Sequence, residues 1–444
     1  MNPTQTPLLE GQPPSPPPDA QRPTPSYKWA VVGMLWFICF FNYADRVAIS
    51  SVFPLLKAQY HFSDSELGMI GAAFTWVYGL AAPLAGHVGD RFARKAVILG
   101  GLYIWSLITG FTALCTKVWQ FVLVRGSEGL GETFYMPASM ALVSDYHTPA
   151  TRSRAIGLHT TSVYAGTIAG GALAGWMGKE FGWRSPFWTL AIVGILLGFV
   201  LNAFIREPRR NQAERQERGD ESESAEPEHV PMLRFLADFC RTPTAVLLIA
   251  AYAGANFVSL VFLIWMPSFL TRKFGLDLAL AGVGATIFIQ IASMVGSILG
   301  GVWADRWSLR RAEGRIRLQA LAVLLGAPFV FLCGYTRDPW TLVAAMTLYG
   351  LFKGMYDSNL TAAFYDVITP ARRATATGLM NMLGWVVGGL GPWAIGVAMD
   401  HGVTMSAAIS STAVVFLGVA ALLYYASVAT APRDIRRMQS PAIP

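Results

Sequence analysis

The chain has 444 residues, of which 53% are hydrophobic and only 14% are charged. Soluble domains carry about 25% charged residues, so this composition predicts a membrane protein and argues against a soluble enzyme. The formal net charge of +7 does not indicate a nucleic-acid partner, because the basic residues gather in alternate loops between apolar segments.

Twelve apolar stretches reach the length of about 20 residues that a membrane-spanning helix needs. In chain order they lie at 29–52, 67–89, 96–116, 118–143, 154–178, 185–206, 243–269, 280–304, 316–336, 340–365, 374–398 and 404–428. The sequence therefore predicts an all-α membrane protein with twelve transmembrane helices.

Lysine and arginine are distributed unequally between the two sets of loops. The side that holds both termini carries 24 of the 34 basic residues, the opposite side carries seven, and three lie within helices. Since cytoplasmic loops are rich in these residues, we expect both termini in the cytoplasm and the protein in the inner (plasma) membrane.

The segments outside the helices divide the chain. Residues 1–27 are rich in proline, lack the apolar core of a signal peptide, and are predicted to be a disordered cytoplasmic tail. The charged stretch 207–241 is predicted to be a cytoplasmic linker between bundles at 28–206 and 242–430, and 431–444 a second tail. The four cysteines lack metal-ligand spacing, so no metal or cofactor is expected.

Two motifs of the first half recur in the second. Gly86-His-Val-Gly-Asp90-Arg91 reappears as Gly301-Val-Trp-Ala-Asp305-Arg306, and the segment 145–152 reappears at 366–373. Both repeats fall at the same ends of equivalent helices, so the sequence predicts two six-helix bundles that run parallel.

Two parallel halves with Gly86-x-x-x-Asp90-Arg91-x-x-Arg94-Lys95 between the second and third helices resemble the major facilitator superfamily. Arg125-Gly-x-x-Gly129-x-Gly131-Glu132 also resembles the family pattern, although Ala93 replaces a family glycine. The resemblance implies a secondary transporter, not an enzyme, that works by alternating access with its solute between helices 1, 4, 7 and 10. It also implies a cytoplasmic gate formed by Gly86, Asp90, Arg91, Arg94, Asp305 and Arg306.

Within that superfamily, Asn42-Tyr43-Ala-Asp45-Arg46 with Glu132 resembles two branches: the spinster-like lysolipid carriers and the anion:cation symporters of sugar acids. Residues 206–210 and 304–311 favour the first branch, whereas 262–267 and 378–383 favour the second. The expected substrate is therefore an organic anion or an anionic or zwitterionic, lysolipid-like amphiphile.

Charged residues inside the predicted helices are the strongest functional signal. Each costs about 2.5–3.5 kcal/mol on insertion scales, so such residues usually mark a transport pathway. Helical spacing places them on shared faces. The sets are Asn42, Asp45 and Arg46 on helix 1, Arg125, Glu128 and Glu132 on helix 4, and Lys353 with Asp357 on helix 10.

Three cations face four carboxylates in these helices, which leaves one excess negative charge. A buried, unpaired carboxylate is disfavoured, so we expect Asp45 or Glu132 to take up a proton and couple it to transport. Arg46 is expected to bind a carboxylate or phosphate of the solute. Further expected substrate contacts are Asn42, Tyr43, Tyr135, Asn256, Lys353, Tyr356, Asp357 and Trp385.

Other interpretations stay open on the sequence alone. Arg125 with Glu128 is a predicted buried charge network or a pair that only neutralises itself, and Lys353 with Asp357 has the same alternative. An uncoupled lipid facilitator and a non-transporting membrane sensor are the alternatives to a proton-coupled symporter. The expected partners are the solute, protons and the lipid bilayer, with the protein a monomer.

Overall fold

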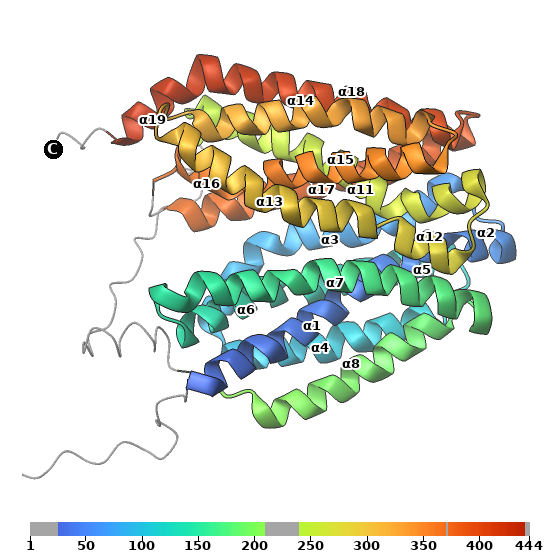
Figure 1. Cartoon of the computed structure of the whole chain (residues 1–444). Coiled ribbons are helices and arrows are strands. Elements are labelled where there is room, and N and C mark those ends of the chain that lie inside the picture. Colours follow the sequence, from blue (N-terminus) through green and yellow to red (C-terminus); the bar gives the residue numbers. More distant parts are fainter. Residues whose placement is uncertain (1–24, 209–238, 370–371, 440–444) are drawn as a thin grey trace, which may run out of the picture.

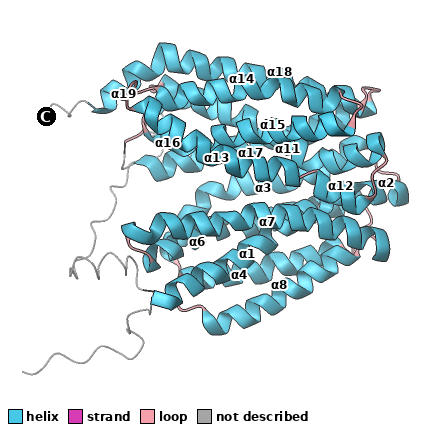
Figure 2. Cartoon of the chain, in the orientation of Figure 1, coloured by secondary structure: helices cyan, strands magenta, loops and turns pink. Residues whose placement is uncertain are grey.

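The computed structural model describes residues 25–208, 239–369 and 372–439; within these, the side chains at 25, 86, 87, 89–91, 149, 374 and 439 are outside the description. All regular structure in the described part is helical (Figure 2). Figure 1 shows two neighbouring bundles, with α2 and α12 at one end and α19 at the other.

The first half contains six membrane-crossing segments. They are α1 (Pro25–Ser51), α3 (Asp64–Arg91), α4 (Arg94–Thr112), α5 (Val118–Thr133) continued by α6 (Tyr135–Tyr146), α7 (Pro149–Phe181) and α8 (Ser185–Phe204). The short helix α2 (Phe53–Tyr60) follows α1. We call the end of the molecule where α8 ends and α11 begins the linker end, and the opposite end, where α3 begins, the far end.

The second half repeats this order. Its segments are α11 (Pro243–Phe274), α12 (Leu278–Gly284) continued by α13 (Ile287–Ser308), α14 (Gly314–Tyr335), α15 (Pro339–Asp357) continued by α16 (Leu360–Tyr365), α17 (Arg373–Asp400) and α18 (Met405–Tyr425). The π-helix η3 (Ala426–Thr430) and α19 (Ala431–Gln439) follow α18.

Nine helical segments in the described part are long and apolar enough to cross a membrane. The other three crossings are α5–α6, α7 and α15–α16. Two of these carry five of the seven charged residues singled out in the sequence, and the other two, Asp45 and Arg46, lie on α1. The prediction of an all-α membrane protein with twelve transmembrane helices in two six-helix bundles is thereby confirmed.

Three of the twelve predicted helices are interrupted, which the sequence analysis did not expect. The break between α5 and α6 follows Thr133, four residues before Pro137, whose ring lacks an N–H and collides with the carbonyl four residues earlier. At the break between α15 and α16, the Asn359 amide donates to the carbonyls of Met355 and Gly300. Side-chain bonds of this kind compete with the helical backbone pattern.

Both predicted tails include residues that are helical in the structure. Helix α1 already starts at Pro25, inside the predicted tail 1–27. Residues 431–439 form α19, whose Asp434 is buried and accepts from the backbone N–H and hydroxyl of Thr244 at 3.1 and 2.6 Å. A carboxylate at the first turn of α11 satisfies otherwise unpaired N–H groups, so this part of the predicted tail belongs to the fold.

The two halves meet along α3 with α17 and along α7 with α12. Gly171 and Gly282 bring the backbones of α7 and α12 together so closely that a Cβ on either would overlap the other. Gly170 allows the same close approach of α7 to Ala44, the residue beside Asp45 on α1. This packing fixes the position of the charged face of α1.

Candidate functional site

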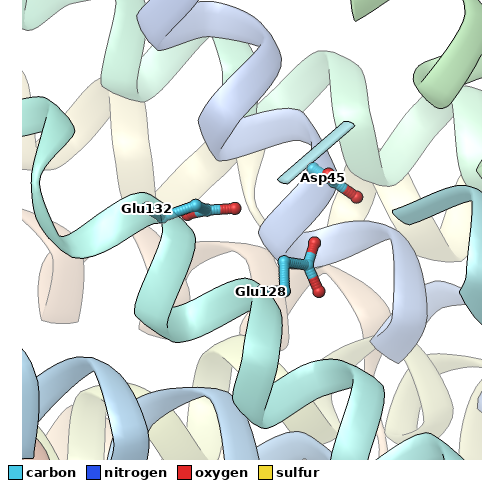
Figure 3. A group of neighbouring side chains, drawn as sticks. All are labelled: Asp45, Glu128 and Glu132. Atoms are coloured by element: carbon cyan, nitrogen blue, oxygen red, sulfur yellow. The ribbon is translucent and has the colours of Figure 1, made fainter. Parts of the chain in front are cut away.

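The charged faces of α1 and α5 meet in the interior of the first half. Asp45, Arg46, Arg125, Glu128 and Glu132 are each at least nine-tenths buried. Figure 3 shows the carboxyl groups of Asp45, Glu128 and Glu132 in the space between α1 and α5. We call these five residues the charge cluster.

Two ion pairs organise the charge cluster. Arg46 Nε donates to Glu132 Oε2 at 2.6 Å, which joins α1 to α5. Arg125 pairs with Glu128 within α5, at the three-residue spacing noted in the sequence, and its Nη2 donates to the Arg46 carbonyl at 3.1 Å. Two guanidinium groups thus hold two of the three carboxylates.

Asp45 is the remaining carboxyl group, and it has no ion-pair partner among the described residues. Its Oδ2 is in hydrogen-bonding contact with Thr109 on α4, while its buried Oδ1 contacts no donor there. Thr109 Oγ1 also lies 2.9 Å from the Trp105 carbonyl and 3.3 Å from Glu128 Oε1. Thr109 was missed by the sequence analysis, because a lone threonine in an apolar helix carries no distinctive signal.

Aromatic rings enclose the Arg46 guanidinium. Its Cζ lies 4.6, 4.9 and 4.7 Å from the ring centroids of Tyr43, Phe74 and Tyr78, a geometry in which the ring faces attract the cation. Phe74 and Tyr78, both on α3, were not predicted. Tyr78 also meets Trp385 of α17 edge-on, with centroids 5.2 Å apart. A single ring therefore separates Arg46 from the second half.

Several polar atoms of this site lack a hydrogen-bond partner within the described part of the chain. They are Arg46 Nη1, Glu132 Oε1, Asp45 Oδ1 and both amide atoms of Asn42, which is fully buried on the same face of α1. Buried polar groups in folded proteins are normally paired, so unpaired ones that converge indicate a place for a ligand, a proton or water.

The carboxyl oxygens of Asp45, Glu128 and Glu132 come within 4.8 Å of one another, a spacing that one cation could bridge. Two of the three carboxylates are already neutralised by arginine, however, so a site for a divalent metal would displace existing ion pairs. A single proton balances the remaining charge without such a rearrangement. The expectation of no metal therefore stays a prediction that the geometry favours.

The expected substrate contacts of the second half form a separate group. Lys353 and Asp357 make an ion pair along α15, with side chains 23% and 42% exposed. Asn256 on α11 is half-buried with a buried, unpartnered amide nitrogen, and Tyr356 is buried with an unpartnered hydroxyl, among the described residues. Trp385 is the member of this group that reaches the charge cluster, through Tyr78.

Tyr135 lies among helices of the first half. Its hydroxyl donates to the Leu35 carbonyl at 2.7 Å and lies 3.1 Å from His159 Nε2, and its ring packs edge-on against Trp105. These contacts join α6 to α1 and α7. A substrate contact for Tyr135 remains a prediction, and its observed contacts are those of helix packing.

The residues of the expected gate are only partly described. The side chains of Gly86, Asp90 and Arg91 lie outside the described residues. Arg94 pairs with Asp145 and donates to the Ala141 carbonyl at 2.8 Å. In the second half, Arg306 is exposed and Arg315 bridges Asp305 and Asp366 at 3.1 and 3.0 Å. These described ion pairs each stay within one half.

The burial of the Arg125–Glu128 pair predicts a strong effect of removing one partner. We expect Glu128→Ala to lower the free energy of unfolding by about 3–5 kcal/mol, because the buried Arg125 charge loses its carboxylate. Asp357→Ala, which breaks a more exposed pair on the equivalent helix, should cost at most about 1 kcal/mol. Thermal unfolding of both variants in detergent compares them, and equal losses would contradict this view of the cluster.

Comparison with known proteins agrees with this architecture. The family model described as Major Facilitator Superfamily matches residues 35–392 and 286–443. A probable galactarate/D-glucarate transporter of Escherichia coli is 25% identical over 443 residues, covering 93% of this chain and 94% of its own length. A sphingosine-1-phosphate transporter of Xenopus tropicalis is 25% identical, covering 86% of this chain and 76% of its own.

Among solved structures, a bacterial homologue of the human lysosomal transporter spinster superposes with a TM-score of 0.74. It is 20% identical and covers 94% of this chain and all of its own, so it supports the fold alone. With a family model that matches most of its length, the chain belongs to the Major Facilitator Superfamily and is a multi-pass secondary transporter.

Proposed function

We propose that this transporter couples protons to the movement of an organic anion, or of an anionic or zwitterionic amphiphile, by alternating access. The observation that carries the proposal is Asp45, a buried carboxyl group without a cation partner among the described residues, placed beside the Arg46–Glu132 pair.

The charge balance of the cluster supports proton binding. Arg46 and Arg125 supply two positive charges against three carboxyl groups, and the low dielectric of a protein interior makes an unbalanced charge costly. Glu128 and Glu132 each have a guanidinium partner, so Asp45 is the group that a proton stabilises most. Of the two predicted proton carriers, the contacts favour Asp45.

The Thr109 contacts support the same assignment. A threonine hydroxyl has one proton to donate, yet Thr109 Oγ1 lies near three acceptors: the Trp105 carbonyl, Glu128 and Asp45. If Thr109 donates to one of the first two, its contact with Asp45 requires a proton on the Asp45 carboxyl group. Protonation of Asp45 both provides the missing hydrogen-bond donor and removes the excess negative charge of the cluster.

Arg46 links the proton to the anion. Glu132 occupies its Nε, while Nη1 has no partner among the described atoms. An incoming carboxylate or phosphate at Nη1 adds negative charge within the cluster, so its binding becomes more favourable once Asp45 is neutral. By linkage, anion binding strengthens proton binding by the same factor.

The relatives and the site both support an anionic solute. One relative is described as a probable transporter of galactarate and D-glucarate and another as a transporter of sphingosine-1-phosphate, and all three solutes carry an anionic group. A guanidinium can bind either a carboxylate or a phosphate through two parallel hydrogen bonds. The half-buried rings of Tyr43, Tyr78 and Trp385 provide a surface for the less polar part of the solute.

The orientation is also a proposal, with the linker end in the cytoplasm, since 24 of 34 basic residues lie on that side. Cys240 is the exposed one of the four cysteines and lies at the linker end. A membrane-impermeant maleimide should therefore label Cys240 in inverted vesicles but not in intact cells, and a cysteine at the far-end position Lys117 should show the reverse. Labelling of Cys240 from outside intact cells would overturn the orientation.

Neutralising Asp45 should uncouple transport. At one proton per solute, a gradient of about one pH unit drives about tenfold accumulation, since one unit is worth about 1.4 kcal/mol. In proteoliposomes supplied with sugar acids and lysolipids, the wild-type protein should show this accumulation. Asp45→Asn should only equilibrate the solute, because it holds the neutral state permanently.

Asp357→Asn is the matched control, because its carboxyl group belongs to a pair outside the charge cluster. Asp357 is an expected substrate contact, so Asp357→Asn should lower the rate or the affinity at most, and it should keep the dependence of accumulation on the gradient. Full gradient dependence in Asp45→Asn would remove Asp45 from coupling, and loss of it in Glu132→Gln alone would assign the proton to Glu132. An uncoupled facilitator would show no accumulation even in the wild-type protein.

Arg46→Lys tests the anion site. A lysine keeps the charge but cannot present two parallel donors, so solute affinity should fall about 10- to 100-fold. Arg315→Lys, at the linker end and away from the cluster, should leave affinity unchanged. Equilibrium binding to purified protein measures both variants, and wild-type affinity in Arg46→Lys would exclude Arg46 as the anion site.

A further inference from the structure

The first turn of α3, at the far end, contacts residues of both halves. The Asp64 carboxylate is bound by Lys57 of its own half at 2.7 Å and by Arg272, in the last turn of α11, at 2.8 and 3.3 Å. The backbone N–H groups of Asp64 and Ser65 both donate to the Asp400 carboxylate at 2.9 Å. Asp400 is the last residue of α17.

We propose that Asp64, Arg272 and Asp400 form a releasable latch that holds the far entrance closed and sets how readily it opens. This far-end latch joins the halves twice, once by an ion pair and once by a carboxylate of the second half that caps a helix of the first. It goes beyond the proposed function, because it makes no use of the solute or of the coupling ion.

The backbone around the latch is built for close approach. A Cβ on Gly396, one turn before Asp400, would overlap backbone atoms of Asp64 and Ser65, and a Cβ on Gly68 would overlap the backbone of Pro392. Contact at this distance is possible only with glycine at both positions. The carboxylate of Asp400 is thereby brought to the N-terminus of α3 without an intervening side chain.

The capping of α3 shows why the latch can release. Ser63 Oγ accepts from the Glu66 N–H at 3.1 Å, and Glu66 Oε2 accepts from the Ser63 N–H at 2.8 Å, a complete capping box within the first half. The box leaves the N–H groups of Asp64 and Ser65 free, and these are the two that Asp400 binds. When the halves separate, water can replace Asp400 while the box preserves the start of α3.

The ion pair between Asp64 and Arg272 can also separate without leaving either residue unstabilised. Asp64 keeps Lys57 when Arg272 leaves, and Arg272 stays in the last turn of α11, where the helix dipole favours a cation. Neither charge is then left alone. Release of the latch therefore breaks the contacts between the halves but leaves no buried charge without a stabilising partner.

Asp400, unlike Arg272, is less stable when the halves separate, so it favours the closed far end. A carboxylate at the C-terminus of its own helix, α17, is disfavoured by the helix dipole, whereas the N-terminus of α3 favours it. Its interaction energy thus differs between the closed and open far end, and only such a difference shifts a conformational equilibrium. At the linker end, the described ion pairs of Arg94 with Asp145 and of Arg315 with Asp305 and Asp366 each join residues of one half.

The test measures opening of the far end directly. Spin labels on Lys117→Cys and Val403→Cys, in far-end loops of opposite halves, report the separation when Cys240 is replaced by serine. We expect Asp400→Asn to raise the ratio of long to short distances about tenfold, since bonds to a charged acceptor are stronger than those to a neutral one. Arg272→Gln should shift the ratio in the same direction.

Two matched controls make the result specific. Lys57→Gln also removes one cation from Asp64, but a cation of the same half, and Glu180→Gln neutralises an exposed acid at the same end. Both should leave the distance distribution as in the wild type. A wild-type distribution in Asp400→Asn overturns the latch, as does an equal shift in Lys57→Gln and Arg272→Gln. If Asp400→Asn does not yield folded protein, the comparison of Arg272→Gln with Lys57→Gln tests the latch, which requires that only Arg272→Gln shifts the distance distribution.

Discussion

In the proposed mechanism, function depends on one constraint, an unbalanced carboxyl group in a buried cluster. Arg46 and Arg125 neutralise Glu132 and Glu128, and Asp45 is left in a site that water does not screen. Such a cluster reaches neutrality by binding a proton, because an exchange of partners among the same five groups leaves its net charge unchanged. In the proposed mechanism Arg46 pairs with Glu132 and also binds the anion, so the occupancy of the proton site and that of the anion site are linked.

Helix α3 connects this cluster to the opening of the molecule. Its first residue, Asp64, belongs to the far-end latch, and Phe74 and Tyr78, further along the same helix, lie against the Arg46 guanidinium. Tyr78 also touches Trp385 of α17, the helix that ends in Asp400. A movement of α3 against α17 therefore changes the latch and the surroundings of Arg46 together, because residues of both lie on these two helices.

The sequence predicted the elements that follow from periodicity and failed where tertiary contacts decide. The twelve spans and the Arg125–Glu128 pair could be predicted from hydropathy and helical spacing. The break at Pro137 had a visible signal, whereas the break at Asn359 depends on its bond to Gly300, 59 residues away. Thr109, Phe74 and Tyr78 look like ordinary helix residues until α3 and α4 bring them to the cluster.

The two halves share a fold but differ in their chemistry. Lys353 occupies the position in the second half that Glu132 holds in the first, 221 residues earlier, yet it finds Asp357 one turn away on its own helix. That pair is balanced and partly exposed, so it needs neither a proton nor a second helix. Glu132 on α5 instead pairs with Arg46 on α1, whose Nη1 has no partner among the described residues. The internal symmetry therefore sets the scaffold, and in the proposed mechanism the asymmetric placement of charge puts the proton site in the first half.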